Sequence, residues 1–148
     1  MNHSFLSARV TLWVNRGIMA ALAVLMPLMP GFTGWLVKVR PLTDAAGTAI
    51  LTAFYCCCVP VTLALLRLDG LMRNILAGDV FVHANVNHIR LIRWCCLAVS
   101  LICLPAAYFY LPLIFMAVIM AFLSLVVNVV SQVMKAAVAI REENDLTV

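Results

Sequence analysis

The sequence predicts an all-α polytopic membrane protein, in which four transmembrane helices form an antiparallel bundle with both termini in the cytoplasm. Its 148 residues are 66% hydrophobic and only 11% charged, whereas soluble domains carry about 25% charged residues. The apolar residues fall in four long runs, and most arginines and lysines lie between these runs. Because a soluble chain of this length has too little interior for so many apolar side chains, we expect one domain, residues 1–148, in lipid.

A membrane-spanning helix needs about 20 mostly apolar residues. Four runs meet this requirement, at about residues 17–37, 45–66, 91–111 and 112–134. They contain no Asp, Glu, Lys or His, and Arg93 lies at the edge of the third run. The first run is long for a signal peptide and no clear Ala-x-Ala cleavage site follows it, so we expect it to remain as a span.

The distribution of positive charge predicts the orientation, because Lys and Arg accumulate on the cytoplasmic side of a membrane. Only Lys38 and Arg40 lie between the first two runs; the other eight of the ten positive residues lie before the first run, between the second and third, or after the fourth. We therefore expect both termini, the loop 67–90 and the tail 135–148 in the cytoplasm, at the inner membrane of a bacterium.

The first half of the chain contains three local signals. Residues 1–16 form an amphipathic lead-in that we expect at the membrane interface. Pro27 and Pro30 each remove a helical hydrogen-bond donor, which predicts a kink in the first span. Thr43 or Asp44 is placed to cap the second span, since a side-chain oxygen there can accept a hydrogen bond from free amides.

The middle loop predicts two helical extensions that meet at a short corner. Apolar residues at helical spacing over 65–75 continue the second helix beyond the membrane, and Gly78 is typical of a helix C terminus. His83 or Asn85 then caps a helix that enters the third span, with Phe81 at the corner.

The fourth span continues as good helical sequence into the tail. Glu142, Glu143 and Asp145 are acidic and lie on the predicted side of the basic loop. The sequence allows them to pair with Arg67, Arg73 or Arg90 of that loop, although a solvated tail is the more common arrangement, because exposed ion pairs add little stability.

Small residues recur every three or four positions in each span. In lipid such residues allow close approach of helix backbones, so the pattern predicts one packing seam per helix. The seams are Gly17, Ala20, Pro27, Gly31 and Gly34; Ala46, Ala49, Ala53, Cys56, Pro60 and Ala64; Cys96, Ser100, Cys103 and Ala107; and Ala117, Ala121, Ser124, Asn128 and Ser131.

The six cysteines do not form a recognisable metal or redox motif. No C-x-x-C occurs, and no His or carboxylate lies at their depth. We interpret them as small packing residues, with binding of a soft metal such as Cu(I) at Cys56, Cys57 and Cys58 as the alternative. We expect no catalytic, cofactor-binding or metal-ligating residue, and we do not expect an enzyme.

Two stretches resemble a known family. Gly78-Asp79-Val80-Phe81, Asn85 and Ile89-Arg90-Leu91-Ile92 resemble a family pattern G-x-x-F, Asn and a basic–apolar helix, although His83 and Ala84 stand where Thr or Pro and Glu are usual. The closing residues 142–148, EENDLTV, resemble the family's final E-E-N-D-L-T-[IV]. The chain is thus similar to the bacterial Domain of Unknown Function 2975 family of small four-span membrane proteins.

That resemblance implies a regulatory role. The family has no assigned reaction, but its members are often encoded beside a small helix-turn-helix DNA-binding protein, which implies that the membrane protein controls that regulator. The polar, patterned residues of this chain gather on the predicted cytoplasmic face, where such a partner would bind. The candidate partner-binding residues are Phe81, Asn85, Arg90, Glu142, Glu143 and Asp145.

The leading hypothesis is therefore a regulatory or sensory membrane module, which binds its partner through the middle loop and tail and does not itself bind nucleic acid. The alternative is a small transporter or channel that works as a homo-oligomer. Since ion transport usually needs an ionisable group within a span, only neutral or apolar cargo fits that alternative.

Overall fold

The structure, a computed structural model, describes the backbone of residues 2–39, 43–78 and 82–146, and within these ranges the side chains from Arg9 to Asn144. The described residues form four α-helices and contain no strand, which confirms the predicted all-α class. The helices are α1 (Asn2–Val39), α2 (Asp44–Leu76), α3 (His83–Ala107) and α4 (Leu113–Leu146).

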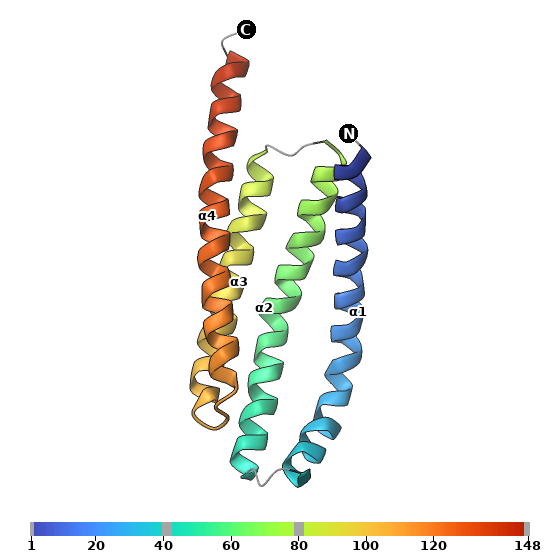
Figure 1. The fold of residues 1–148 in the computed structure, drawn as a ribbon, viewed down its shortest axis with the longest axis vertical. Helices are drawn as coiled ribbons and strands as arrows, with labels where there is room; N and C mark the ends of the chain where they lie inside the picture. Colours follow the sequence, from blue (N-terminus) through green and yellow to red (C-terminus); the bar gives the residue numbers. More distant parts are fainter. Residues whose placement is uncertain (1, 40–42, 79–81, 147–148) are drawn as a thin grey trace.

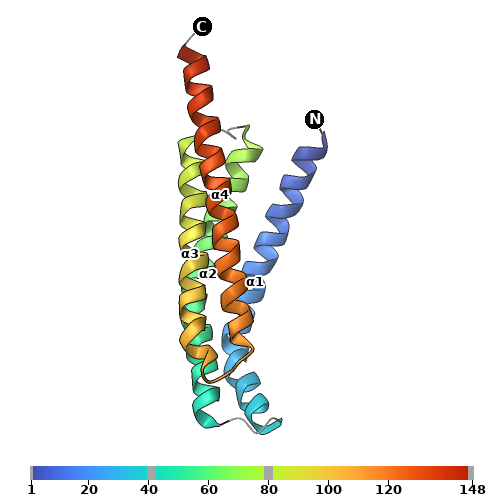
Figure 2. The ribbon, with the colours of Figure 1, turned by 60° about the vertical axis from the view of Figure 1, so that its left-hand side comes forward.

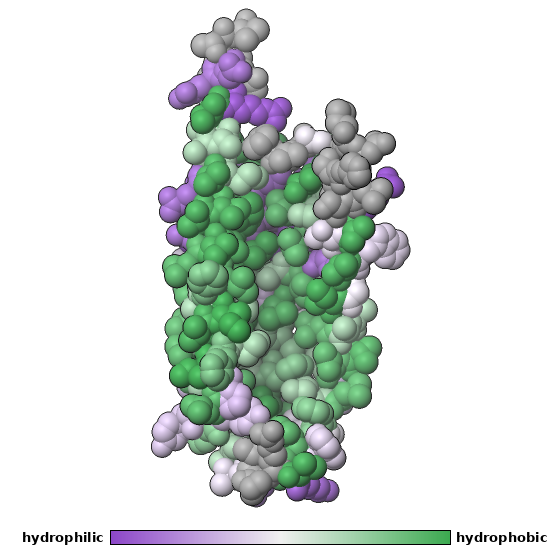
Figure 3. All heavy atoms as spheres, viewed as in Figure 1, coloured by the Kyte–Doolittle hydropathy of each residue, from purple (hydrophilic) through white to green (hydrophobic). Residues whose placement is uncertain are grey.

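All four helices are long and apolar enough to cross a membrane. Figure 3 shows hydrophobic residues covering most of the middle of one face, with hydrophilic residues gathered toward its two ends. Large apolar side chains such as Val59, Phe122 and Val133 are well exposed on the protein surface. Such a surface is what lipid contact requires, because a soluble protein rarely exposes a continuous apolar patch of this extent.

The ends of α2 and α3 differ from the predicted caps. Thr43 is the N-cap of α2, but its side chain makes no capping hydrogen bond, and its carbonyl accepts the first helical amides instead. α3 begins at His83 after Val82, again without a side-chain cap, so the predicted cap at His83 or Asn85 is wrong. The predicted end of α2 is confirmed: Gly78 has φ +93°, a left-handed conformation that glycine adopts without steric cost.

α1 is continuous through its two prolines. Pro27 and Pro30 lie within the helix, and Figure 1 shows that the second half of α1 bends toward α2. An apolar concavity of about 630 Å³ lies at this part of the helix, between residues that include Pro27, Gly31 and Trp35. The bend agrees with the kink expected from the missing proline donors.

The link between the third and fourth helices is longer than predicted. α3 ends at Ala107 rather than at residue 111, and turns closed by backbone hydrogen bonds occupy the interval before Leu113. Pro112 is suited to the start of a helix, because the N–H that it lacks would have no partner in the first turn, and α4 begins at the next residue.

The helices lie side by side in chain order. In the described residues, α1 packs on α2, α2 on α3 and α3 on α4, and no other pair of helix backbones approaches closely. Figures 1 and 2 show that α1 begins, α2 ends, α3 begins and α4 ends at one end of the molecule, here called the α2–α3 end. α4 extends beyond the other helices at this end (Figure 1).

The predicted seams of the third and fourth spans are confirmed. All four seam residues of α3 are buried, and the seam residues of α4 are buried or half-buried. Val99, Cys103 and Ala117 form the centre of the core, with Cys57, Val61 and Met120 packed around them. Ser100 fixes this contact by donating a 2.8 Å hydrogen bond to the carbonyl of Ala117.

The predicted seam of the first span is wrong. Gly17, Gly31 and Gly34 have no atom within 4 Å of where a Cβ would lie, so this stripe faces away from the other helices. The face of α1 that packs on α2 instead follows a second stripe with the same spacing. Its buried and half-buried residues are Leu12, Asn15, Met19, Leu22, Met26, Met29, Thr33, Leu36 and Val37.

Candidate partner-binding site

The α2–α3 end contains most of the predicted site residues. Glu142 and Glu143 are exposed on the extension of α4, and Arg90 is exposed on α3. Phe81 lies outside the described residues, as does the side chain of Asp145, although its backbone belongs to α4. The structure therefore brings three of the six predicted residues to the protein surface at one end.

Asn85 is a structural residue rather than a surface contact. Its side chain is fully buried between α2 and α3. Its Oδ1 accepts a 2.8 Å hydrogen bond from Nδ2 of Asn74. A buried amide whose polar atoms are bonded inside the protein is not available to a partner, so the prediction that Asn85 binds one is corrected.

The acidic tail is tied to the start of α3. Oε1 of Glu142 lies 2.9 Å from Nε2 of His83, and both side chains are largely exposed. The predicted arginine partner is thus replaced by a histidine at this position. Because the pair is solvated, it adds little stability, about 0–1 kcal/mol, and in the structure it places Glu142 of the extension beside the start of α3.

A buried carboxylate at the same end was not identified as a site residue by the sequence reasoning. Asp69 of α2 is 8% exposed. Its Oδ2 accepts from Arg73, one turn along α2, at 2.6 Å, and its Oδ1 accepts from Nε of Arg16 in α1 at 3.3 Å. Asn15, also buried, donates from Nδ2 to the carbonyl of Leu65 at 3.0 Å. The contacts of Arg16 and Asn15 join α1 to α2 near the predicted membrane boundary.

One signal for this cluster was present in the sequence. Asp69 and Arg73 are four residues apart, a spacing that places opposite charges on one helix face. The contribution of Arg16 had no such signal, because it comes from another helix. The predicted pairing of Arg73 with the tail is replaced by this contact with Asp69.

A close contact joins α2 and α3 beside the buried asparagines. A Cβ built on Gly70 would lie 3.3 Å from the imidazole ring of His88, so a side chain at residue 70 would require this ring to shift by a few tenths of an ångström. Nδ1 of His88 is buried and has no hydrogen-bond partner in the described part of the chain. His88 is therefore held against α2 by packing.

The cysteines contribute to packing within the helices. Cys96 and Cys103 lie in the confirmed seam of α3, whereas in α2 the side chain of Cys56 is exposed and that of Cys58 is buried. Sγ of Cys57 lies 3.9 Å from Sγ of Cys103 across the α2–α3 contact. The residues described by the structure contain no group of three or more His, Cys, Asp or Glu placed to hold a metal ion.

Chemically, this end can form ionic and hydrogen-bonded contacts with another molecule. The carboxylate of Asp69 pairs with Arg73 of its own helix and with Arg16 of α1, and the second pair joins the two helices. The outward charges of this end, which include Glu142, Glu143 and Arg90, face solvent or the membrane surface. Of these, Arg90 also lines a polar pocket with residues of α4.

Comparison with known proteins identifies the family. Neither the curated proteins nor the solved structures give a match to this chain. A family model described as "Protein of unknown function (DUF2975)" matches residues 18–148, which include all of α2, α3 and α4 and most of α1. The chain therefore belongs to this family, as its loop and tail motifs predicted.

Proposed function

We propose that this protein is a regulatory or sensory membrane module that binds a cytoplasmic partner, such as a helix-turn-helix transcription regulator, at its α2–α3 end. The observation that carries the proposal is the shape of that end. α4 extends past the other helices (Figure 1) and carries exposed charged residues that include Glu142 and Glu143. An extension with an acidic, solvated surface suits a basic partner, since opposite charges steer encounter and select partners.

The proposal requires an antiparallel bundle with the α2–α3 end in the cytoplasm of a bacterial inner membrane. Seven of the ten Lys and Arg residues lie in the segments that this orientation places in the cytoplasm, and Arg93 lies at the cytoplasmic edge of the third span, as the positive-inside rule expects.

Thiol labelling tests this orientation. In a variant without native cysteines, Asn144→Cys and Thr43→Cys place single thiols near opposite ends of the molecule. In intact cells a membrane-impermeant maleimide should label the thiol at residue 43. It should label the thiol at residue 144 only after the cells are opened. Labelling of residue 144 from outside intact cells would show that the orientation is the reverse of the one proposed, and would contradict binding of a cytoplasmic partner at this end.

The binding test uses purified proteins. The membrane protein is placed in nanodiscs, and its affinity is measured for the helix-turn-helix protein encoded beside its own gene. We expect Glu142→Gln with Glu143→Gln to weaken binding at least about fivefold, since each rim charge is worth roughly 0.5–1 kcal/mol. Lys38→Gln, an equally exposed charge near the other end, is the control and should leave the affinity unchanged. Equal affinity for all variants would contradict this docking site.

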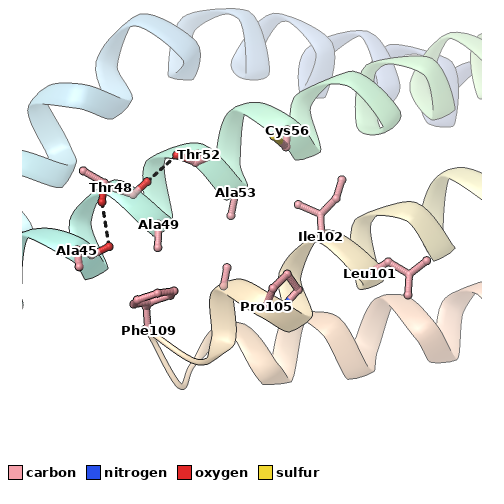
Figure 4. Close-up of a pocket in the computed structure, with 11 residues that line it drawn as sticks. Ala45, Thr48, Ala49, Thr52, Ala53, Cys56, Leu101, Ile102, Pro105 and Phe109 are labelled. Carbon is pink, nitrogen blue, oxygen red and sulfur yellow. Dashed lines mark hydrogen bonds between the residues drawn. The ribbon is translucent and has the colours of Figure 1, made fainter.

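The alternative, an oligomeric transporter or channel for neutral or apolar cargo, is supported by one cavity. A space of about 650 Å³ lies between α2 and α3 toward the end opposite the α2–α3 end. Figure 4 shows Ala49, Ala53 and Phe109 at this space. The hydroxyls of Thr48 and Thr52 donate to backbone carbonyls of α2, so the lining offers few groups to a polar solute.

Flux measurements distinguish the two functions. If the cavity carries apolar cargo, proteoliposomes should move a neutral apolar dye, and Ala49→Phe should block this movement by filling the cavity. Flux equal to that of protein-free liposomes would remove the alternative.

A further inference from the structure

A polar pocket lies between α3 and α4, apart from the acidic extension. Its volume is about 340 Å³. Since a water molecule occupies about 30 Å³ in the liquid, the pocket has room for roughly ten waters or for a small charged group. Its lining residues are Arg90, Arg93, Asn128, Ser131, Gln132 and Lys135.

The pocket contains three positive charges and no carboxylate among its described lining residues. Arg93 donates from Nη1 to Oδ1 of Asn128, and its guanidinium lies 5.1 Å from the centroid of the Trp94 ring. Neither contact neutralises its charge. Arg90 and Lys135 form no ion pair or hydrogen bond with the described residues. An anion is therefore the group that would complete this site electrostatically.

The depth of the pocket matches a membrane surface. With a rise of 1.5 Å per residue, Arg93 lies about 21 Å along α3 from Ala107, and Lys135 lies about 33 Å along α4 from Leu113. If Ala107 and Leu113 mark one edge of a hydrocarbon layer about 30 Å thick, these two residues lie on either side of its other edge. The pocket thus extends across the edge of the hydrocarbon layer toward the headgroup region, where lipid phosphates lie.

The side chains of the two helices lean toward one another. In an α-helix the Cα–Cβ bonds tilt toward the N terminus. α3 begins at the end of the molecule where α4 ends (Figure 1). Arg90 and Arg93 therefore lean toward the membrane surface, while Gln132 and Lys135 lean back from the extension. This convergence is how a single small group can contact donors from both helices.

We propose that this pocket binds the phosphate group of an anionic phospholipid in the leaflet at the α2–α3 end. Guanidinium groups donate paired hydrogen bonds to phosphate oxygens, and the lysine adds a point charge. Oδ1 of Asn128 accepts from Arg93, which leaves its Nδ2 as a further donor. Free inorganic phosphate shares this chemistry, but the depth of the pocket places it where headgroups are concentrated. Basic pockets between membrane helices are a known mode of headgroup recognition.

Binding of short-chain lipids tests the proposal. Affinities are measured in neutral detergent micelles for dihexanoyl phosphatidylglycerol, dihexanoyl phosphatidylcholine and inorganic phosphate. The pocket variant carries Arg90→Gln and Lys135→Gln. The matched control carries Arg9→Gln and Arg67→Gln, which removes the same charge from exposed positions on α1 and α2.

We expect the wild-type protein to bind phosphatidylglycerol better than phosphatidylcholine, and the pocket variant to lose about 30-fold in affinity for phosphatidylglycerol. The control should change this affinity by less than about twofold, because charges beyond about 8 Å are largely screened at physiological salt. Unchanged affinity for phosphatidylcholine and an unchanged circular dichroism spectrum show that the pocket variant is folded.

Three results would overturn the proposal. Equal losses in the pocket variant and the control would mean that total charge, not the pocket, attracts the anionic lipid. Tight binding of inorganic phosphate that excludes phosphatidylglycerol, and that the pocket substitutions abolish, would assign the pocket to free phosphate. If the pocket variant binds both lipids with the same affinity as the wild-type protein, the pocket is not a phosphate site.

Discussion

A single hydroxyl holds α1 against α2 in the middle of the membrane. Oη of Tyr55 in α2 donates a 2.9 Å hydrogen bond to the carbonyl of Met26 in α1. In a regular helix that carbonyl accepts from the amide of residue 30, but Pro30 has no N–H. Tyr55 therefore satisfies the acceptor that the proline leaves open, in a region without water to replace it.

The perturbation that tests this contact is Tyr55→Phe. The substitution keeps the ring and removes only the donor, so the carbonyl of Met26 loses its described partner. Leaving an acceptor unpaired away from water costs about 1–3 kcal/mol, and hydrogen bonds between membrane helices are worth about 0.6 kcal/mol on average and up to about 1.7. We expect a loss of about 1–2 kcal/mol in the free energy of unfolding.

A second protein background, with Pro30→Ala, distinguishes the loss of a partner for the Met26 carbonyl from a general effect of removing the Tyr55 hydroxyl. Pro30→Ala supplies the missing N–H, so the Met26 carbonyl keeps a donor when Tyr55 is changed. In that background Tyr55→Phe should cost only about 0.5 kcal/mol, which makes the two substitutions coupled by about 0.5–1.5 kcal/mol.

The assay is reversible unfolding in mixed micelles with increasing dodecyl sulfate, followed by far-ultraviolet circular dichroism. Tyr108→Phe is the matched control, because Tyr108 is 89% exposed and the same atom is removed. An equal cost of Tyr55→Phe with proline or alanine at position 30 would contradict this role of the Tyr55 hydroxyl, as would no cost in the wild-type background.

Three further predictions concern the other helix contacts. Gly47→Ala should destabilise the protein by about 1–3 kcal/mol, because its Cβ would lie 2.8 Å from Cγ2 of Val37, and Val37→Ala should restore most of that loss in the same unfolding assay. In a variant that keeps only Cys57 and Cys103, mild oxidation should link α2 to α3, so that fragments cut between these helices separate only after reduction; fragments that separate without reduction would contradict this contact. Asn85→Ala should lower the free energy of unfolding by about 1–3 kcal/mol, and a loss of partner binding at unchanged stability would show that Asn85 is a contact residue after all.

The sequence predicted α3 and α4 well because their small residues and their packing face coincide. Ser100 and Ala117 are small, lie on the predicted seams and contact one another across the core. The sequence also located the end of α2, because the backbone at residue 78 is left-handed and glycine is the residue that adopts this conformation without steric cost. In both cases the structural requirement has a local sequence signal.

α1 was predicted less well because it carries two stripes with the same spacing. The small-residue stripe, which includes Gly17 and Gly31, faces away from the other helices. The stripe that packs on α2 includes three methionines, whose flexible side chains fill irregular gaps without requiring small neighbours. Composition favours the first stripe, and only the position of α2 distinguishes the two.

Contacts between distant polar residues had no such local signal. Asp69 is paired with Arg16 across two helices, and Asn74 with Asn85. Each residue alone is typical of a solvated helix end. Their pairing depends on how neighbouring helices are shifted along their axes relative to one another. A repeat of apolar or small residues every three or four positions does not specify this shift.

The contacts of α1 are of a different kind from those of α3 and α4. Among the residues that the structure describes, the backbone of α1 lies beside α2 alone. Specific contacts join the two helices at three heights: Arg16 with Asp69, Met26 with Tyr55, and Val37 against Gly47. α3, in contrast, has neighbours on two sides and a continuous buried seam. Because local opening begins where buried contacts are fewest, α1 should separate before the α2–α3–α4 unit unfolds. Loss of any one of the three contacts should therefore increase hydrogen exchange in α1 more than in α3.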